Sequence, residues 1–318
     1  MFAVRTHISP GLRDVGYRHC GQMCTSQCFK ALRNFWRPMI VKILIPLCVM
    51  LLMFIVGTGL QLKQFRVLME SPVPLLGGTL LQMVLLPASA LGIVVLIQPS
   101  IELAAGLLLV SACPGGALSN YYSHLGRLNV ALSVMMTAVS SLLAFAVLPF
   151  ILAIVFPLIA SVQQTEIPAA QLVRQLFVIL LLPIGVGMLI RKFFRVIVEL
   201  HTSRLRALGL VLVVLLLGLI LFDQWEGATR LFTDALVLAV LFTGIAVLAG
   251  WFSGVLTKQN IVDRYTFAVE FSVRNVGIGA VVAATALDRP EFVIFGALFV
   301  VIQFPLIMLL LFAYRARS

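Results

Sequence analysis

The sequence predicts an all-α polytopic membrane protein with about nine transmembrane helices, and three observations lead to this fold class. The chain of 318 residues is 61% hydrophobic and only 11% charged, whereas soluble domains carry about 25% charged residues. A membrane-spanning helix needs about 20 apolar residues, and runs of that kind fill nearly everything after residue 38. The runs are continuous and do not alternate, which excludes a β-barrel.

The runs, taken in chain order, divide into two groups around a central one. The first four cover residues 40–60, 75–97, 101–125 and 129–156, and the last four cover 205–222, 233–256, 264–287 and 291–313. A fifth run, 170–190, lies between the groups. This number excludes a single anchor or an isolated helical hairpin. It leaves no room for a soluble domain, so residues 39–318 are expected to form one transmembrane domain.

Residues 1–38 differ from the rest, because they form a polar and basic N-terminal tail. A secretory signal needs an apolar core of about 7–15 residues, and this segment has none. It contains six basic residues: Arg5, Arg13, Arg18, Lys30, Arg33 and Arg37. The segment is read as a tail or a surface-lying helix, and a start codon assigned too early is an alternative because Met39 opens the first apolar run.

Loop charges predict the orientation. Basic residues gather in alternate loops and in the C-terminal tail: Lys63, Arg66, Arg127, Arg191, Lys192, Arg195, Arg204, Arg206, Lys258, Arg264, Arg315 and Arg317. The positive-inside rule then places the C-terminus in the cytoplasm, in a cell inner membrane. Nine spans would leave the basic tail outside, against that rule, unless the start is wrong or the tail never crosses. Because the basic residues lie in loops and tails, the net charge of +11 does not indicate nucleic-acid binding.

Two of the runs are interrupted. Pro114 removes a backbone donor and Gly115–Gly116 weaken a helix in the third run, and Asn275 and Gly277 follow two charges in the eighth. Interruptions at corresponding positions of two halves indicate a transporter binding site. Breaks are therefore expected at about 112–118 and 273–277, close to each other. The halves form a first repeat at about 40–156 and a second at about 170–314, and the unmatched fifth run suggests a lost N-terminal partner.

Glu270 and Arg274 place two charges inside the eighth run. If the helix persists, they are neighbours on one face, and a buried ion pair would be their simplest role. A charge near the bilayer centre costs about 2.5–3.5 kcal/mol on insertion scales, which favours a functional role for Glu270. Pro114, Gly115 and Gly116 could instead be packing residues, because small residues let transmembrane helices approach closely. The polar residues that follow them favour an unwound segment.

Two other classes of membrane protein fit the sequence less well. An enzyme is not expected, because the sequence has no Ser–His pair with a GxSG-like turn, no HExxH and no aspartate-rich diphosphate motif. A channel would favour rings of charge and a repeated pore motif. Two broken helices that share one buried carboxylate fit a carrier with alternating access better.

Four motifs at these positions resemble the bile acid:sodium symporter family in its bacterial type. They are "GTGLQLKQF" (57–65), "CPGGALSN" (113–120), "NVALSVMMT" (129–137) and "EFSVRN" (270–275). The resemblance implies nine or ten spans in inverted repeats, with two broken helices crossing in a core domain and other helices forming a panel domain. It also implies sodium-coupled symport of a small organic anion by alternating access, with one or two Na⁺ ions.

The resemblance also implies the site residues. A first sodium site would use Ser119, Asn120, Ser133, Thr137 and Glu270. These supply the oxygen ligands that hard cations prefer, and Ser133 and Thr137 face one way on a helix. A second site would use Gln82, Glu270, the backbone carbonyls around Phe271 and Val273, and the side chain at 274. The substrate would meet Asn275, Arg274, Gly116 and Ala117.

Arg274 departs from the family, which usually has Gln there. The guanidinium could replace the second sodium ion, bind an anionic substrate, or pair structurally. Gln82 could instead form a buried interhelical hydrogen bond, and Asn275 could cap the second half-helix. The sequence thus predicts a sodium-coupled organic anion symporter. The alternative is a proton-coupled or uncoupled carrier in which Arg274 replaces one sodium ion, and the oligomeric state is not predicted.

Overall fold

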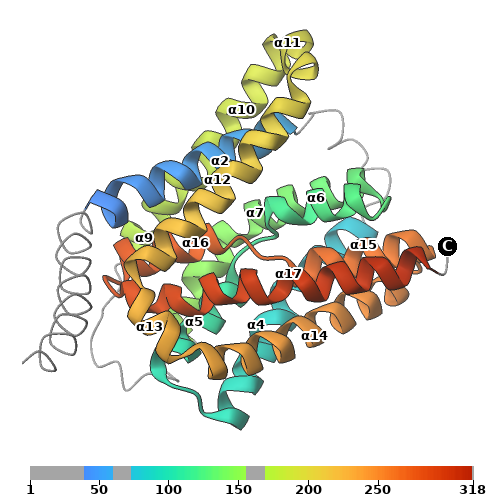
Figure 1. Ribbon diagram of the computed structural model, residues 1–318. Helices are drawn as coiled ribbons and strands as arrows, with labels where there is room; N and C mark the ends of the chain where they lie inside the picture. Colours follow the sequence, from blue (N-terminus) through green and yellow to red (C-terminus); the bar gives the residue numbers. More distant parts are fainter. Residues whose placement is uncertain (1–38, 60–72, 155–168, 317–318) are drawn as a thin grey trace, which may run out of the picture.

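The computed structural model describes residues 39–59, 73–154 and 169–316 (Figure 1). Within these ranges the chain is helical almost throughout, and its only β-type contact is one isolated bridge. The all-α class is therefore confirmed. The basic tail 1–38, the loop with Lys63 and Arg66, and the last part of the fourth run lie outside the described residues, so those expectations stay predictions.

The first four predicted runs correspond to five α-helices, two of which have π-helical extensions. These are η2 Ile40–Leu44 with α2 Ile45–Gly59, η3 Val73–Gly77 with α4 Gly78–Ile97, α5 Ile101–Ala112, α6 Ala117–Leu125 and α7 Val130–Ile154. The fifth run corresponds to α9 Ala169–Leu176, η4 Phe177–Leu181 and α10 Leu182–Phe193. Short α11, Arg195–Leu200, then leads out of α10.

The last four runs are also helical. They correspond to α12 Thr202–Asp223, α14 Phe232–Leu256, the pair α15 Ile261–Ser272 and α16 Val276–Val281, and α17 Val293–Arg315. Short α13 Trp225–Arg230, η5 Val282–Ala286 and η6 Pro290–Phe292 complete the chain. Among the residues that the structure describes, six helices are long and apolar enough to cross a membrane, so this is a multi-pass membrane protein. The count of nine spans remains a prediction.

Both interruptions occur where the sequence predicts them. The first half-helix of each broken span has 12 residues, and each ends in an extended residue, Cys113 or Val273. The extended segments meet: Gly116 N donates to Val273 O at 3.0 Å and Asn275 N donates to Pro114 O at 2.9 Å, forming an antiparallel bridge. Backbone groups freed by a helix break must find partners inside a membrane protein, and here each break supplies them to the other.

The two broken spans also have similar ends. Four non-glycine residues in the described ranges have positive φ, namely Gln98, Arg127, Lys258 and Asp288. Gln98 and Lys258 lie just before α5 and α15, whereas Arg127 and Asp288 lie just after α6 and η5. This likeness agrees with the two-repeat organisation, which stays a prediction.

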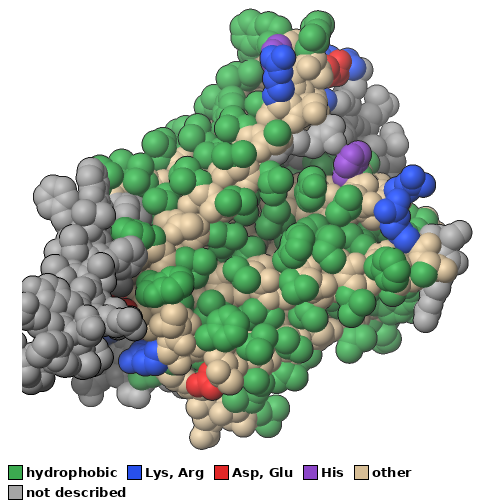
Figure 2. Space-filling model, viewed as in Figure 1, with side chains coloured by type: hydrophobic (Ala, Val, Ile, Leu, Met, Phe, Trp, Pro, Cys, Tyr) green, Lys and Arg blue, Asp and Glu red, His purple; other side chains and the backbone are tan. Residues whose placement is uncertain are grey.

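The helices form two groups (Figure 1). Helices α2, α10 and α12 run side by side, with α2 in contact with both others; we call this group the arm. The body consists of α4, α5, α6, α7, α14, α15 and α17, and α16 packs against α2 of the arm. Figure 2 shows hydrophobic side chains over most of the visible face and charged ones at its ends, as expected for a surface in contact with lipid.

Candidate cation and substrate site

A cluster of side-chain oxygens lies beside the crossing of the broken helices. Ser119 and Asn120 belong to the first turn of α6, Ser133 and Thr137 lie one turn apart on α7, and Glu270 is near the end of α15. Glu270, Ser119 and Ser133 have no exposed surface, and Thr137 is 1% exposed. The five residues predicted as a first cation site are thus brought together by three helices.

The oxygens are close enough to hydrogen bond. Thr137 Oγ1 donates to Glu270 Oε1 at 2.7 Å, and Ser133 Oγ lies 2.9 Å from Glu270 Oε2 and 2.8 Å from Asn120 Oδ1. Ser119 Oγ is 3.4 Å from Thr137 Oγ1 and 3.5 Å from Ser133 Oγ. Thr137 Oγ1 is also 3.5 Å from Asn120 Oδ1. Six oxygen–oxygen contacts therefore join five side chains.

Too few protons are available for these six contacts. A hydroxyl donates one proton, and an ionised carboxylate or an amide oxygen only accepts. Ser119 Oγ already donates to Gly116 O at 2.8 Å, which leaves the protons of Ser133 and Thr137. With Glu270 ionised, at least four of the six contacts then bring together lone pairs with no proton between them. A surplus of acceptor oxygens around one carboxylate suits a hard cation, which binds oxygen ligands.

The type of cation follows from the ligand chemistry. Zinc and copper prefer nitrogen and sulfur ligands, and the described ranges contain no group of three or more His, Cys, Asp or Glu residues placed to hold a metal ion. The cluster has one carboxylate and otherwise neutral oxygens. A monovalent cation needs only that single negative charge for neutrality, and the residues present fit it.

Gly115 makes room for this cluster. Its N–H donates to Ser140 Oγ at 3.1 Å, and a Cβ at this position would overlap the Glu270 carboxylate. The unwound segment can therefore lie directly against the carboxylate because the residue at this point has no side chain.

Glu270 and Arg274 do not form the ion pair that a continuous helix would allow. Helix α15 ends at Ser272, so the two residues no longer share a helical face. No ion pair within 4.0 Å joins them, although both belong to the described part of the chain. The ion-pair interpretation is therefore wrong, and its error is the assumption that the helix continues.

The Arg274 guanidinium instead reaches the end of α5. Its Nη2 donates to Cys113 O and to Ser111 O, the latter at 3.2 Å. These carbonyls belong to the last turn of a helix, where backbone acceptors lack partners and a cation is favoured. Arg274 is 3% exposed, and its Nε and Nη1 have no hydrogen-bond partner.

The residues predicted for a second cation site do not form a comparable cluster of oxygens, because several of their polar atoms are already hydrogen bonded. Gln82 Nε2 donates to Glu270 O at 2.9 Å, and the Gln82 Oε1 atom has no hydrogen-bond partner. Val273 O accepts from Gly116 N, and Phe271 is completely buried. Gln82 thus forms the interhelical hydrogen bond that was its alternative role, while its amide oxygen remains available as a ligand.

The predicted substrate residues are split between two environments. Ala117 lines a cavity described below, whereas Arg274 and Asn275 are buried at the crossing and Gly116 pairs with Val273 there. The Asn275 side chain does not cap α16; its Nδ2 lies 3.7 Å from Met53 Sδ on α2. The capping role is therefore not observed, and the amide connects the crossing to the arm.

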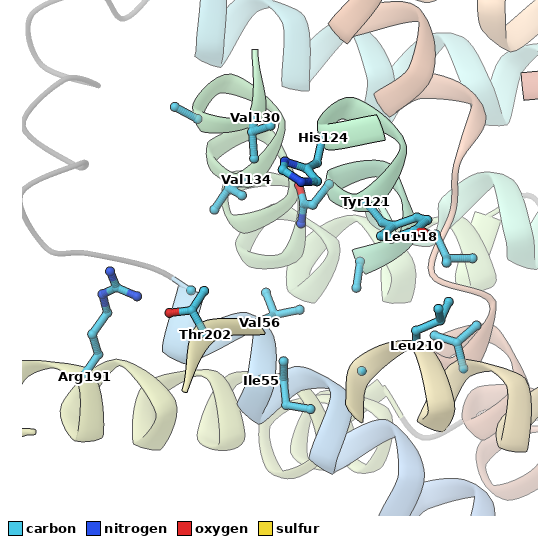
Figure 3. Close-up of a pocket in the computed structure, with 16 residues that line it drawn as sticks. Ile55, Val56, Leu118, Tyr121, His124, Val130, Val134, Arg191, Thr202 and Leu210 are labelled. Atoms are coloured by element: carbon cyan, nitrogen blue, oxygen red, sulfur yellow. The ribbon is translucent and has the colours of Figure 1, made fainter. Parts of the chain in front are cut away.

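A cavity of about 420 Å³ lies between the arm and helices α6 and α7. Figure 3 shows His124, Tyr121 and Val134 on one wall, with Arg191 and Ile55 on the opposite side. Most of the lining is apolar, and it includes Asn120 of the oxygen cluster and Ala117 next to the break. The cavity thus reaches the candidate cation site.

Two basic residues of the cavity have roles that the sequence did not indicate. His124 lies in the last turn of α6, and Arg191 lies in the last turn of α10. Arg191 Nη1 donates to Thr58 O at 2.7 Å and its Nη2 is 3.9 Å from Glu199 Oε1. A hydrogen bond from Arg195 lowers the pKa of Glu199, so this carboxylate stays ionised beside the cavity. The contact between Arg191 and Thr58 joins helices that are far apart in the chain, so only the structure reveals it.

Comparison with known proteins identifies relatives among membrane transporters. The uncharacterized sodium-dependent transporter YocS of Bacillus subtilis is 27% identical over 249 residues, which are 78% of this chain and 76% of that protein. A protein named "Probable sodium/metabolite cotransporter BASS1, chloroplastic" from Arabidopsis thaliana is 28% identical over 74% of this chain and 57% of its own length. A BASS2 protein of the same description from Oryza sativa subsp. japonica is 30% identical over 75% of this chain and 56% of its own length.

The chain thus spans about three quarters of the bacterial relative but little more than half of the plant ones. The family model described as "Sodium Bile acid symporter family" matches residues 46–228, which include α5, α6 and α7 with four of the five clustered residues. Since this match covers more than half of the chain, the protein belongs to the sodium bile acid symporter family, a family of membrane transporters.

Proposed function

We propose that this protein is a secondary active transporter that carries a small organic anion together with sodium by alternating access. The observation that carries the proposal is the proton-poor oxygen cluster at Glu270, which meets the cavity at Asn120. A cation bound there would neutralise the carboxylate and place positive charge at the inner end of the cavity. The sodium-dependent relatives and the family support this reading.

The coupling would arise from the shared position of the two ligands. Without a cation, Glu270 presents an uncompensated negative charge and repels an anion that approaches Ala117 and Gly116. With sodium bound to Ser119, Asn120, Ser133, Thr137 and Glu270, that repulsion is removed. Anion affinity then rises with sodium occupancy, and by linkage sodium affinity rises equally with anion occupancy.

The cavity favours an anion with an apolar part. Its walls are mainly aliphatic side chains such as Val134 and Ile55, and its basic groups are Arg191 and His124. The apolar part of the anion would lie between the arm and the body of the protein. The charged group of the anion would turn toward a basic side chain or toward the helix break. Movement of the arm relative to the body would then open this space on one side of the membrane or the other.

Arg274 bears on the number of sodium ions. Its fixed charge lies at the end of α5 beside the predicted second site, and two of its N–H groups are free of partners. We expect it to act as a resident cation, so that one sodium ion accompanies each anion. The free N–H groups would also suit direct contact with the anion. In the alternative, a carrier coupled to protons or to no ion, Arg274 would likewise replace one sodium ion.

The proposed orientation follows the basic loops. The cavity is bordered by Gly59, His124, Arg191 and Thr202, which lie at helix ends facing the loops rich in Lys and Arg. The positive-inside rule places these loops and the C-terminus in the cytoplasm of an inner-membrane protein. The conformation described here is then the one open to the inside, with the arm corresponding to the panel domain and the body to the core domain.

A thermal-shift screen tests this function. Purified protein is heated with a set of organic anions, in sodium and in potassium at equal ionic strength. Since a ligand stabilises the state that binds it, a transported anion should raise Tm more in sodium than in potassium. The Glu270→Gln variant should lose that difference. Equal shifts in the two salts for every stabilising anion would reject sodium coupling, and no shift with any anion would count against an anion carrier.

A further inference from the structure

We infer that Asp263 and Asn129 are positioning residues that set the register of α7 against α15, and thereby assemble the oxygens around Glu270. This inference rests on the proposed function of that cluster. Neither residue takes part in the predicted site, and neither touches the oxygens directly. Their side chains meet at the ends of the two helices, where α7 and α15 both begin.

One carboxylate joins the N-terminal caps of both helices. Asp263 Oδ1 accepts from Asn129 Nδ2 at 2.8 Å, and Asp263 Oδ2 accepts from Asn260 Nδ2 at 2.7 Å. Asn129 Oδ1 in turn accepts from Leu132 N at 3.0 Å, and Asn260 Oδ1 accepts from Asp263 N at 2.9 Å. Both asparagines therefore cap a helix with the amide oxygen and bind Asp263 with the amide nitrogen.

A second contact strengthens the connection between the same helices. Asn129 N donates to Thr266 Oγ1 at 3.1 Å, and Thr266 has no exposed surface. Asp263 is only 9% exposed, and no Lys, Arg or His of the described ranges lies within 4.0 Å of its carboxylate. Its charge instead faces the positive N-terminal ends of α7 and α15, which favour an anion.

The helical repeat carries this register to the cation cluster. Residues one and two turns beyond Asn129 on α7 are Ser133 and Thr137, and two turns beyond Asp263 on α15 is Glu270. Residues at such spacings share one face of a helix. The contacts between Asn129 and Asp263, and between Ser133 or Thr137 and Glu270, are thus steps of one polar ladder. A slip at the caps would change the oxygen separations at Glu270.

The pattern of donors and acceptors makes a sharp test possible. Asp263→Asn keeps the shape but places one amide N–H group against another, so one of the two bonds is lost. Asn129→Asp places two carboxylates face to face. In the exchange Asn129→Asp with Asp263→Asn, the new amide donates to the new carboxylate, which can still accept from Leu132 N. The amide oxygen at 263 can still accept from Asn260, so every hydrogen bond is recovered.

The experiment measures sodium dependence in both a binding and a transport assay. Wild-type protein, the two single variants and the exchange are compared by the sodium-minus-potassium difference in Tm and by the sodium concentration that half-saturates uptake. Loss of groups that orient metal ligands commonly reduces affinity about 10- to 100-fold. Each single variant should raise the half-saturating sodium concentration on the order of tenfold, the low end of that range. The exchange should return it close to the wild-type value.

Two further variants separate positioning from folding. Asp234→Asn alters an exposed carboxylate in the first turn of α14 and should leave sodium dependence unchanged. Thr266→Val removes the acceptor of Asn129 N together with a hydroxyl that donates to Val262 O within α15. It leaves Asn129 and Asp263 in place, and it should raise the half-saturating sodium concentration in the same direction even if the other single variants fail to fold. A purely structural role would lower Tm equally in sodium and potassium and leave their difference intact.

The outcomes distinguish this inference from the function on which it rests. A wild-type protein without sodium dependence would overturn the proposed function. A sodium-dependent wild type whose folded variants keep wild-type sodium affinity would overturn only the positioning role. An exchange variant that folds and transports no better than the single variants would also contradict it, because its hydrogen bonds are restored.

Discussion

Glu270 occupies the centre of the candidate site because both of its carboxylate oxygens accept hydrogen bonds from α7. The donors are Thr137 at 2.7 Å and Ser133 at 2.9 Å, and the Gln82 amide binds its backbone carbonyl. A carboxylate this deeply buried is costly unless it is paired with a charge or strongly hydrogen bonded. In the proposed transporter, the sodium ion supplies the missing charge.

The first prediction is that Glu270→Gln removes sodium stimulation. The substitution keeps the shape but eliminates the single negative charge, and a contact with a charged group contributes about 1.5–3 kcal/mol. The half-saturating sodium concentration should rise at least about tenfold, as measured by uptake. Glu102→Gln is the control, since Glu102 is partly exposed and pairs with Arg230 at 3.2 Å. Sodium stimulation that survives Glu270→Gln would reject the role of the carboxylate.

A second prediction concerns Arg274→Gln. The Hill coefficient for sodium can rise to the number of interacting sites, so a value near one in the wild type should increase if the new amide oxygen opens a second site beside Gln82. If Arg274 instead contacts the anion, the variant should lose anion binding while sodium still shifts Tm. Uptake and thermal-shift measurements together distinguish the two. Unchanged cooperativity with unchanged anion binding would leave Arg274 without either role.

The sequence predicted those site residues that lie in short local motifs. Ser119, Ser133 and Glu270 were expected together, and they do meet in the structure. The pairing of Glu270 with Arg274 failed, because the chain unwinds after Ser272. The place of His124 in the cavity wall depends on α2, α10 and α12, which no local sequence pattern connects to it.

At the scale of elements, the two breaks stabilise each other. The first contains Pro114 and two glycines, which end α5 by themselves. The second has no proline, and Val273 is extended while its carbonyl accepts from Gly116 N. The sequence located this break from Asn275 and Gly277 after the two charges and from its correspondence with the first break. It could not predict α11 or α13, which are shorter than any membrane-spanning run.

The third prediction tests this crossing through Gly116→Ala. The backbone of Gly116 has φ −95° and ψ 151°, which alanine adopts freely, so only crowding matters. A Cβ there would lie 2.8 Å from Arg274 O and 3.0 Å from its carbonyl carbon. Such overpacking typically costs about 1–3 kcal/mol, and Tm should fall. Gly185→Ala in α10 meets nothing within 4 Å and should be neutral or slightly stabilising. Equal stability of the two variants would contradict the close crossing.

In the whole molecule the cavity lies between the arm and the body, and it meets the cation cluster at Asn120. Hydropathy predicts that the spans exist, but it does not say which of them are neighbours. Helix α2 packs against α10, which follows it by more than a hundred residues. The shape of the cavity and its basic residues therefore required the structure.

The fourth prediction concerns access to that cavity. Val134 lines it on the α7 side (Figure 3). A Val134→Cys variant, in a background where Cys20, Cys24 and Cys28 are replaced by Ser, should react with a polar thiol reagent in detergent. The remaining Cys48 and Cys113 are buried. Sodium with a bound anion should slow labelling, whereas Leu96→Cys, at a position that is 85% exposed, should react equally with and without ligands. Labelling at 134 that ignores an anion known to bind would contradict this cavity as the anion site.

The central claim, sodium-coupled anion transport with one ion per anion, is tested most directly in proteoliposomes. Uptake of an anion identified by thermal shift is measured against an inward sodium gradient, an inward potassium gradient and no gradient. The account predicts saturable uptake and counterflow, accumulation above equilibrium only with sodium, and a Hill coefficient for sodium near one, since cooperativity is limited by the number of sites. Equal uptake in sodium and potassium would contradict sodium coupling, and a Hill coefficient clearly above one would contradict the place given to Arg274.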